Sequence, residues 1–309
     1  MASTGQIIVE KENLPRNIER LAAQKEIYFS AKRLFALQFI ITGVVTIVLA
    51  LIGIALAYFT SASDWNWVRG GYGLIATTGD LFFINHFINQ LRQNAACVQE
   101  LFDCDVLDLP WNKVCCGPQL GPEDIKKYAD KHLKRVGNYD KLKTWYAETI
   151  KDVDGPAAKV ICQRSNFAYD AAIRRSFLFW VAGISLGILI GVLVIALLLN
   201  ASARSIVSMS LFPILPILLF AGKLIKEHRT SLQNLDSLSS AITSLWTEVL
   251  GGNANDNMNA TLRQIQDKIY QNRKTSPLIP EWFYDWKRPG LEQQMYYGVD
   301  ELVRQYLSR

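Results

Sequence analysis

Residues 162–175 read CQRSNFAYDAAIRR, and the chain continues directly into SFLFWVAGISLGILIGVLVIALLLN at residues 176–200. Residues 177–199 contain no charged side chain. As a helix they would rise about 35 Å, enough to cross the roughly 30 Å hydrocarbon core of a bilayer. The stretch therefore predicts a membrane helix that begins in a charged segment, and it places the chain among membrane proteins.

Three further segments are predicted to span the membrane. Residues 34–59 form a second clear apolar run, and residues 72–91 and 206–222 form weaker ones. Each weaker run follows a clear one after a short polar loop. We therefore expect two transmembrane hairpins, residues 34–91 and 177–222, and an all-α membrane protein overall.

The basic residues are unevenly distributed between the two sides of this arrangement. The expected outer loops contain only Arg69 and Arg204. The other basic residues lie in an N-terminal arm (1–33), a central block (92–176) and a C-terminal tail (223–309). The positive-inside rule places these three parts and both termini in the cytoplasm. A cleaved signal peptide is disfavoured for two reasons. The region before the first apolar run is long, and the run itself is longer than the apolar region of a signal peptide.

Composition excludes several classes of function. The formal charge of +5 comes from nearly balanced acids and bases, which does not suit a protein that binds nucleic acid directly. All five cysteines fall in the central block, where a reducing compartment would keep them free. The neighbours Cys115 and Cys116 lack a second pair of ligands at zinc spacing, so we predict no metal and no cofactor. His132 with Cys115 is a weak thiol and base pair, and no catalytic motif is present, so an enzyme is disfavoured.

A polar stripe marks the second span. At 100° per residue, Thr78, Asn85 and Asn89 lie within about 40° of one another, with His86 beside them. Polar side chains within a membrane helix indicate a pathway or a gate. The alternative is that they form hydrogen bonds between helices of one bundle.

The second hairpin has two further features. Gly183, Gly187 and Gly191 recur every four residues and allow another helix to approach closely, within one chain or between subunits. Pro213 and Pro216 predict a bend in the fourth span, either as a hinge or as a resting kink.

The three cytoplasmic parts are expected to be mainly helical. In the N-terminal arm, Asn13 is a plausible cap and Pro15 lies in the first turn of a helix that continues into the first span. Beyond the fourth span, apolar residues from Leu235 to Val249 follow a helical spacing, either as a lever continuous with the span or as a helix packed on the cytoplasmic core. Residues 276–290 are interpreted as an aromatic linker before a last helix at residues 291–307.

The charged segment that opens the third span suggests a ligand site. If it is helical, Arg164 and Arg175 lie within about 20° on one face and about 16 Å apart. Guanidinium groups suit phosphate oxygens, and aromatic rings can stack on a base. The alternative for Arg174 and Arg175 is lipid head groups or pairing with Asp170. The predicted ligand residues are Gln163, Arg164, Asn166, Tyr169, Arg174, Arg175, Trp111 and Trp145.

The chain resembles the SMODS-associated four-transmembrane effectors, pore-forming proteins of bacterial CBASS antiphage operons. The resemblance covers nearly the whole chain in order. It rests on these segments: NIERLAAQKEIYFSAKRL (17–34), QELFDCDVLDLPWN (99–112), GPEDI (121–125), LKTWY (142–146), CQRSN (162–166), SPLIPEWFY (276–284) and EQQMYYGVDELV (292–303).

The resemblance implies a nucleotide-gated effector in the bacterial inner membrane. A partner nucleotidyltransferase would supply a cyclic di- or trinucleotide, which binds the cytoplasmic part and opens or assembles a pore, causing abortive infection. A pore with one polar stripe per chain also implies a homo-oligomer. The alternatives left open are a membrane scaffold, a ligand-gated ion channel unrelated to defence, and a membrane-anchored enzyme.

Overall fold

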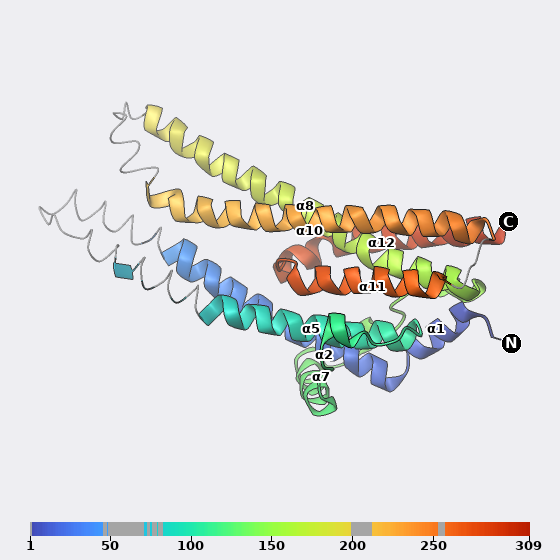
Figure 1. Cartoon of the computed structure of the whole chain (residues 1–309). Coiled ribbons are helices and arrows are strands. Elements are labelled where there is room, and N and C mark those ends of the chain that lie inside the picture. The colour runs from blue at the N-terminus through green and yellow to red at the C-terminus, as the bar shows by residue number, and fades with distance from the viewer. Residues whose placement is uncertain are drawn as a thin grey trace, which may run out of the picture.

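The computed structural model describes residues 2–45, 83–198, 212–252 and 257–309, with a few single positions between them. Within these ranges all regular elements are helical, which agrees with the expected all-α class. Figure 1 shows long helices lying side by side, with the two chain ends at one end of the molecule and the helix ends next to the predicted spans at the other.

The N-terminal arm forms two helices, α1 (Thr4–Glu12) and α2 (Pro15–Phe39), and α2 continues as the π-helical turn η1 (Ile40–Val44). Pro15 occupies the first position of α2, where its missing amide hydrogen costs nothing. The expectation that Asn13 caps this helix was wrong. Asn13 ends α1 instead, and its side chain donates a hydrogen bond back to the Val9 carbonyl.

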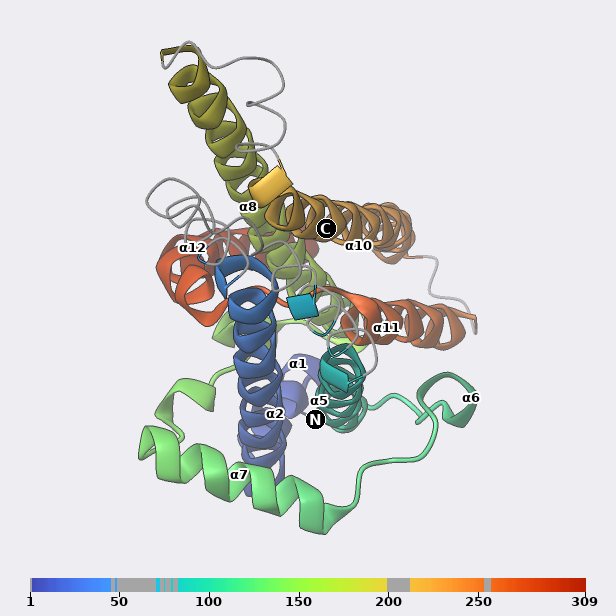
Figure 2. The same ribbon diagram turned by 90° about the vertical axis from the view of Figure 1, so that its left-hand side faces the viewer.

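The central block contains one long helix, α5, and several short elements. Their bounds are α5 (Asn85–Val106), α6 (Lys113–Cys116), α7 (Pro122–Val136), η3 (Asp140–Leu142) and η4 (Glu148–Asp152). Figure 2 shows α7 crossing α2 on the outside of the molecule. Helix α5 packs along α2, so the two segments that flank the first predicted hairpin lie next to each other.

Two helices run from the predicted cytoplasmic part toward the predicted membrane region without interruption. Helix α8 (Gly155–Leu198) contains both the charged segment and nearly all of the predicted third span. Helix α10 (Phe212–Leu250) likewise joins the end of the predicted fourth span to the tail. The apolar positions from Leu235 to Val249 are buried in the main core, so this helix is both continuous and packed on that core.

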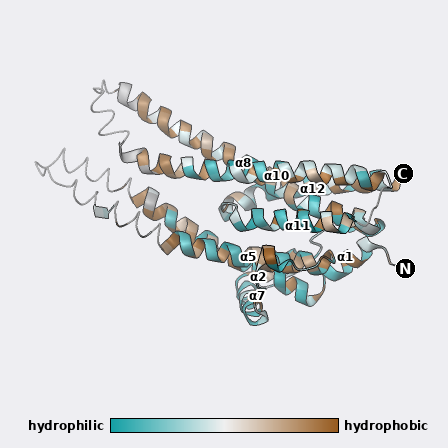
Figure 3. Cartoon of the chain, viewed as in Figure 1, coloured by the Kyte–Doolittle hydropathy of each residue, from teal (hydrophilic) through white to brown (hydrophobic). Residues whose placement is uncertain are grey.

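Within the described ranges, one helix is long and apolar enough to cross a membrane, Gly155–Val194, and only 11% of its most apolar window is buried in the chain. The two apolar helix ends are exposed, as at Leu198 and Leu219, and the ribbon in Figure 3 is mostly coloured as hydrophobic there. Much of the other predicted spans lies outside the described residues, so the four-span arrangement stays a prediction.

The chain ends in helices α11 (Met258–Thr275) and α12 (Glu281–Leu307). The interpretation of residues 276–290 as a linker was wrong from Glu281 onward, because α12 already begins there and includes Pro289. An interior proline costs a helix about 3 kcal/mol. Burial of Phe283 and Leu291 on either side of Pro289 offsets that cost. Figure 2 shows α11 and α12 on opposite sides of α8.

Candidate functional site

A buried polar network joins α5 to α11. The guanidinium of Arg263 pairs with the carboxylate of Glu100. The Gln266 amide donates to Glu100 Oε2 and Asp103 Oδ2, both at 2.9 Å, and Arg273 pairs with Asp103. Burial, and then the nearby Asp103, raise the pKa of Glu100, while Arg263 lowers it. Two carboxylates held inside the core therefore depend on cations from α11.

The same network extends to the charged segment of α8. The Gln163 amide donates to the Leu262 carbonyl (2.9 Å) and to Gln266 Oε1 (3.1 Å). The Asn166 amide donates to Tyr146 Oη (3.1 Å), which in turn lies 3.2 Å from an Asp103 oxygen. Gln163 is fully buried. In this conformation both residues hold segments of the chain together, and their contact with a ligand stays a prediction.

Arg174 and Arg175 have different surroundings although they are neighbours. Arg174 is buried, and its guanidinium donates to Asp170 Oδ2 and to the Pro277 carbonyl, both at 2.8 Å. Arg175 is exposed and lies 3.5 Å from Asp236 of α10. The pairing with Asp170 that we considered as an alternative is therefore present for Arg174.

Residues 276–283, which we call the junction segment, connect α11 to α12 and are held by polar contacts from three helices. Arg92 of α5 donates to the carbonyls of Lys274 (2.9 Å) and Ser276 (3.0 Å). Arg174 of α8 binds the Pro277 carbonyl, and Ser231 of α10 lies 2.6 Å from the Ser276 hydroxyl. Each of these helices leads toward a predicted span.

Apolar contacts of the junction segment add α2, the remaining helix that leads toward a predicted span. Leu278 is buried in one small cluster with Ala31 of α2 and Ile88 of α5. Phe283 is fully buried in a second cluster with residues of α8 and α10, and its ring lies 5.0 Å from that of Phe177. The junction segment thus lies where all four of these helices meet.

His228 of α10 lies in the same region and carries no charge. It is 1% exposed, and neither ring nitrogen has a hydrogen-bond partner among the described residues. Burial, and then the nearby Arg174, lower its pKa to about 3. A neutral imidazole here packs edge-on against Phe177 at 5.0 Å, so it serves as part of the apolar contact.

A hollow of about 310 Å³ opens next to the junction segment, between α10 and the end of α11. It is lined by Lys223, Lys226, Glu227, Thr230, Ser231, Asn234, Thr275 and Ser276. Both lysines are exposed, and the carboxylate of Glu227 offsets one of them. The hollow therefore has little excess positive charge.

The remaining predicted ligand residues are not brought into one place. Tyr169 contacts Tyr284 of α12, with ring centres 5.9 Å apart. Arg164 points toward Gly298 of the same helix but lies about 140° around α8 from Tyr169. Trp145 packs against the main core, whereas Trp111 belongs to a separate cluster with Tyr270 of α11. Arg164 and Trp111 therefore lie apart from Tyr169.

The predicted pore residues lie at the start of α5. Asn85 accepts a hydrogen bond from Gln38 of α2 (3.1 Å), and Asn89 accepts one from Arg92 (2.9 Å). The first contact matches the alternative of hydrogen bonds between helices. His86 is exposed, and Thr78 lies outside the described residues. A role for this stripe in conduction stays a prediction.

The predicted packing and hinge residues lie within the two long helices. No atom of the described residues lies within 4 Å of a Cβ placed at Gly183, Gly187 or Gly191, so their groove is open in the described chain. Pro213 and Pro216 both lie inside α10. Whether they act as a hinge stays a prediction.

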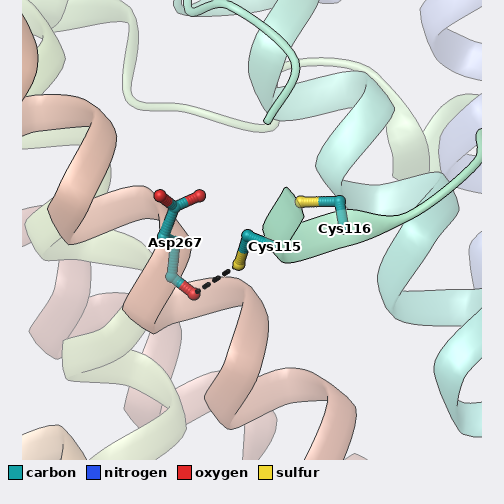
Figure 4. A group of neighbouring side chains, drawn as sticks. All are labelled: Cys115, Cys116 and Asp267. Carbon is teal, nitrogen blue, oxygen red and sulfur yellow. Dashed lines mark hydrogen bonds between the residues drawn. The ribbon is translucent and has the colours of Figure 1, made fainter. Parts of the chain in front are cut away.

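Cys115, Cys116 and Asp267 bring three ligand atoms within 4.8 Å of one another (Figure 4). The Asp267 carboxylate already accepts hydrogen bonds from Arg263 (2.9 Å) and Asn112 (2.8 Å). Burial raises the pKa of both thiols, which keeps them protonated. A divalent cation binds thiolates and free carboxylates, so these contacts give no support to a metal site.

Known proteins resemble this chain over nearly its whole length. The model of the SMODS-associating 4TM effector domain matches residues 6–302. A protein of Bacillus cereus (strain VD146), described as a probable CBASS effector molecule, is 28% identical over 287 residues, which cover 91% of this chain and 92% of the relative. No solved structure matches the chain significantly.

Proposed function

Because the chain belongs to the SMODS-associating 4TM effector family, we propose that it is an antiphage CBASS effector. A cyclic oligonucleotide binds the cytoplasmic part and opens or assembles a pore in the bacterial inner membrane, which ends in abortive infection. The observation that best supports this function is the continuity of α8 and α10, because each connects a packed cytoplasmic half to an exposed apolar half.

Continuous helices suit this function mechanically. Helix α8 has 44 residues, which corresponds to about 66 Å, so a small rotation at its cytoplasmic end displaces the membrane end. The junction segment contacts all four helices that lead toward the predicted spans. A shift of α11 or α12 relative to α2 therefore reaches every one of them.

Binding of a nucleotide can supply the free energy that opening of the pore requires. Moving a closed to open ratio from 99:1 to 1:99 needs about 5.5 kcal/mol of differential binding. Charge-assisted hydrogen bonds contribute roughly 1.5–3 kcal/mol each. Two to four phosphate contacts that form only in the open arrangement would supply the change, and several ligands in one oligomer would lower the demand on each.

The pore itself requires several copies of the chain. A helix with one polar stripe does not enclose an aqueous path alone, so equivalent stripes from neighbouring subunits must face one another. The open groove at Gly183, Gly187 and Gly191 suits close contact with a helix of a second copy. We therefore propose a homo-oligomer in which α8 packs between subunits.

The test is dye release from lipid vesicles that contain the purified full chain. A panel of cyclic di- and trinucleotides is added, with the matching linear nucleotides and empty vesicles as controls. Release by a cyclic species and not by its linear form would support the proposed function. If the inserted, folded protein binds no cyclic species and releases no dye, the proposal fails and a membrane scaffold becomes the better account.

A further inference from the structure

Aromatic and basic side chains from α2, α8, α12 and the connection between η3 and η4 gather beside the junction segment. We call the set Lys25, Trp145, Tyr169, Tyr284 and Arg288 the α2–α12 face. Tyr169 and Tyr284 share a cluster with Phe35 of α2. Lys25 lies 5.9 Å from the ring centre of Trp145 and within electrostatic range of Arg288. Helices α2, α8 and α12, which all contact or continue the junction segment, thus contribute to one face.

Lys25 has no counter-ion in this setting. It is partly buried and forms no hydrogen bond or ion pair with any residue that the structure describes. Burial is the main reason why its pKa falls from 10.5 to about 8. The charged groups that act on it are Arg288 and Lys141, which lower the pKa, and Glu281 and Glu292, which raise it. A partly buried cation without a partner costs stability, so an anion that binds it would be favoured.

The two acids that act on Lys25 are already paired with other cations, and the exposed Asp285 acts on Tyr169 instead. Glu281 pairs with Lys32, and Glu292 accepts a hydrogen bond from Arg288 at 2.7 Å. Lys25 and Lys141 are therefore left without an acidic partner among the described residues. The surplus positive charge suits phosphate groups better than a second carboxylate of the chain.

The aromatic residues add a second, independent preference. Tyr169 and Tyr284 lie 5.9 Å apart and tilted, and Lys32 lies 4.9 Å from the Tyr284 ring centre. The Tyr169 hydroxyl is shielded from water. It lies near the Tyr284 hydroxyl, but the two do not have the geometry of a hydrogen bond, so the Tyr169 hydroxyl lacks a partner among the described residues. Rings beside cations suit stacking on a nucleobase, and the free hydroxyl suits a hydrogen bond to its edge.

We propose that the α2–α12 face binds a phosphate group and the adjacent base of the cyclic oligonucleotide, with Lys25 at the phosphate and Tyr169 at the base. The inference rests on the function proposed above and names where its ligand binds. A ligand held between α2 and α12 acts directly on the junction segment, because Tyr284 directly follows that segment and Lys32 pairs with Glu281 at the start of α12.

The first experiment measures nucleotide affinity of the full chain in detergent. The probes are cyclic di-AMP, cyclic di-GMP, cyclic GMP–AMP and cyclic tri-AMP, and the variants are Lys25→Gln and, as matched control, the exposed Lys268→Gln of α11. Loss of one charge-assisted contact predicts at least an about tenfold weaker affinity for Lys25→Gln and no change for Lys268→Gln. The unfolding temperature of Lys25→Gln should not fall, which separates lost binding from lost folding.

A pH series separates a direct contact from a structural role. Affinity of the natural chain should fall between pH 7 and pH 9 as Lys25 loses its proton, whereas Lys25→Arg should keep its affinity over that range. Burial raises the pKa of Glu12 to about 8 as well, but Glu12 is unchanged in Lys25→Arg, so this variant distinguishes the two groups.

The possible results discriminate between the two proposals. If a cyclic nucleotide binds the natural chain and Lys25→Gln equally well, the site assignment is wrong and the proposed function stands. If no probe binds the natural chain and none releases dye, both are wrong. Weakened binding by Lys25→Gln and by Tyr169→Phe, with retained affinity in Lys25→Arg, would establish the site.

Discussion

Replacing Leu278 by alanine tests whether the junction segment controls opening. Leu278 is 6% exposed and packs with Ala31 of α2 and Ile88 of α5. Removing its three outer carbons should cost about 2–5 kcal/mol, and we take about 2.5 kcal/mol because its cluster is small. A conducting path between helices requires them to separate, so a contact that holds α2, α5 and the junction segment together stabilises the closed arrangement.

The expected leak follows from this energy. A loss of about 2.5 kcal/mol changes an equilibrium about 60-fold. A closed to open ratio of about 99:1 would fall to about 1.6:1, so about 40% of the oligomers would be open without nucleotide. The assay is dye release from vesicles containing Leu278→Ala in buffer alone, compared with the natural chain.

The matched control is Leu142→Ala. Leu142 of η3 is also buried but packs in the main core, which contains no residue of the junction segment. Both variants should unfold at a lower temperature, and only Leu278→Ala should leak. Vesicles with Leu278→Ala could retain their dye although the variant unfolds at a lower temperature. This result would show that the contact is the same in the closed and open arrangements and does not control opening.

Three further predictions concern other parts of the chain. Burial raises the pKa of Glu12 from 4.5 to about 8, so the folded chain keeps a proton that the unfolded chain loses, and stability should fall by up to about 5 kcal/mol as the pH rises from 4.5 to 8. Glu12→Gln should lack this loss, and the difference in unfolding temperature should grow over that range; a constant difference would contradict the assignment. Arg263→Met leaves the buried Glu100 without its cation and should cost about 3–5 kcal/mol in thermal or denaturant unfolding. Adding Glu100→Gln should recover part of this cost, and a purely additive double variant would argue against the pair. Asn85→Leu and Asn89→Leu should leave assembly intact and lower single-channel conductance, and unchanged currents would remove these residues from the path.

The long helices could be predicted from the sequence because their signals are local. Helix α8 follows from an uninterrupted helical pattern between residues 160 and 199, and the first position of α2 follows from Pro15. The start of α12 was missed because Pro280 and Pro289 suggest a break. A proline before the first turn is compatible with a helix, and the second is tolerated through the burial of Phe283.

The roles of the polar side chains depend on tertiary packing and could not be read from one segment. Gln163 and Arg174 have the chemistry of ligand residues, but α11 and the junction segment cover them. Lys25 and Arg288 were not singled out, since each looks like an ordinary surface residue on its own helix. For Lys25 the available signal was its place in the segment 17–34 that resembles the family, whereas Arg288 lies between two such segments and had no such signal.

The buried network explains why binding at the α2–α12 face would reach the membrane. Glu100, Asp103 and Gln266 tie α5 to α11, and Gln163 ties α11 to α8. These helices must therefore move as one body, because separating them would leave buried charges unpaired at several kcal/mol each. Helix α2 belongs to the same body, because Arg20 pairs with Asp105 and Gln24 donates to Gln99 of α5. Helix α12 lies outside these bonds. A ligand that changes the spacing of α2 and α12 would shift the junction segment against the rigid body, and this relative movement is the step that the Leu278→Ala leak measures.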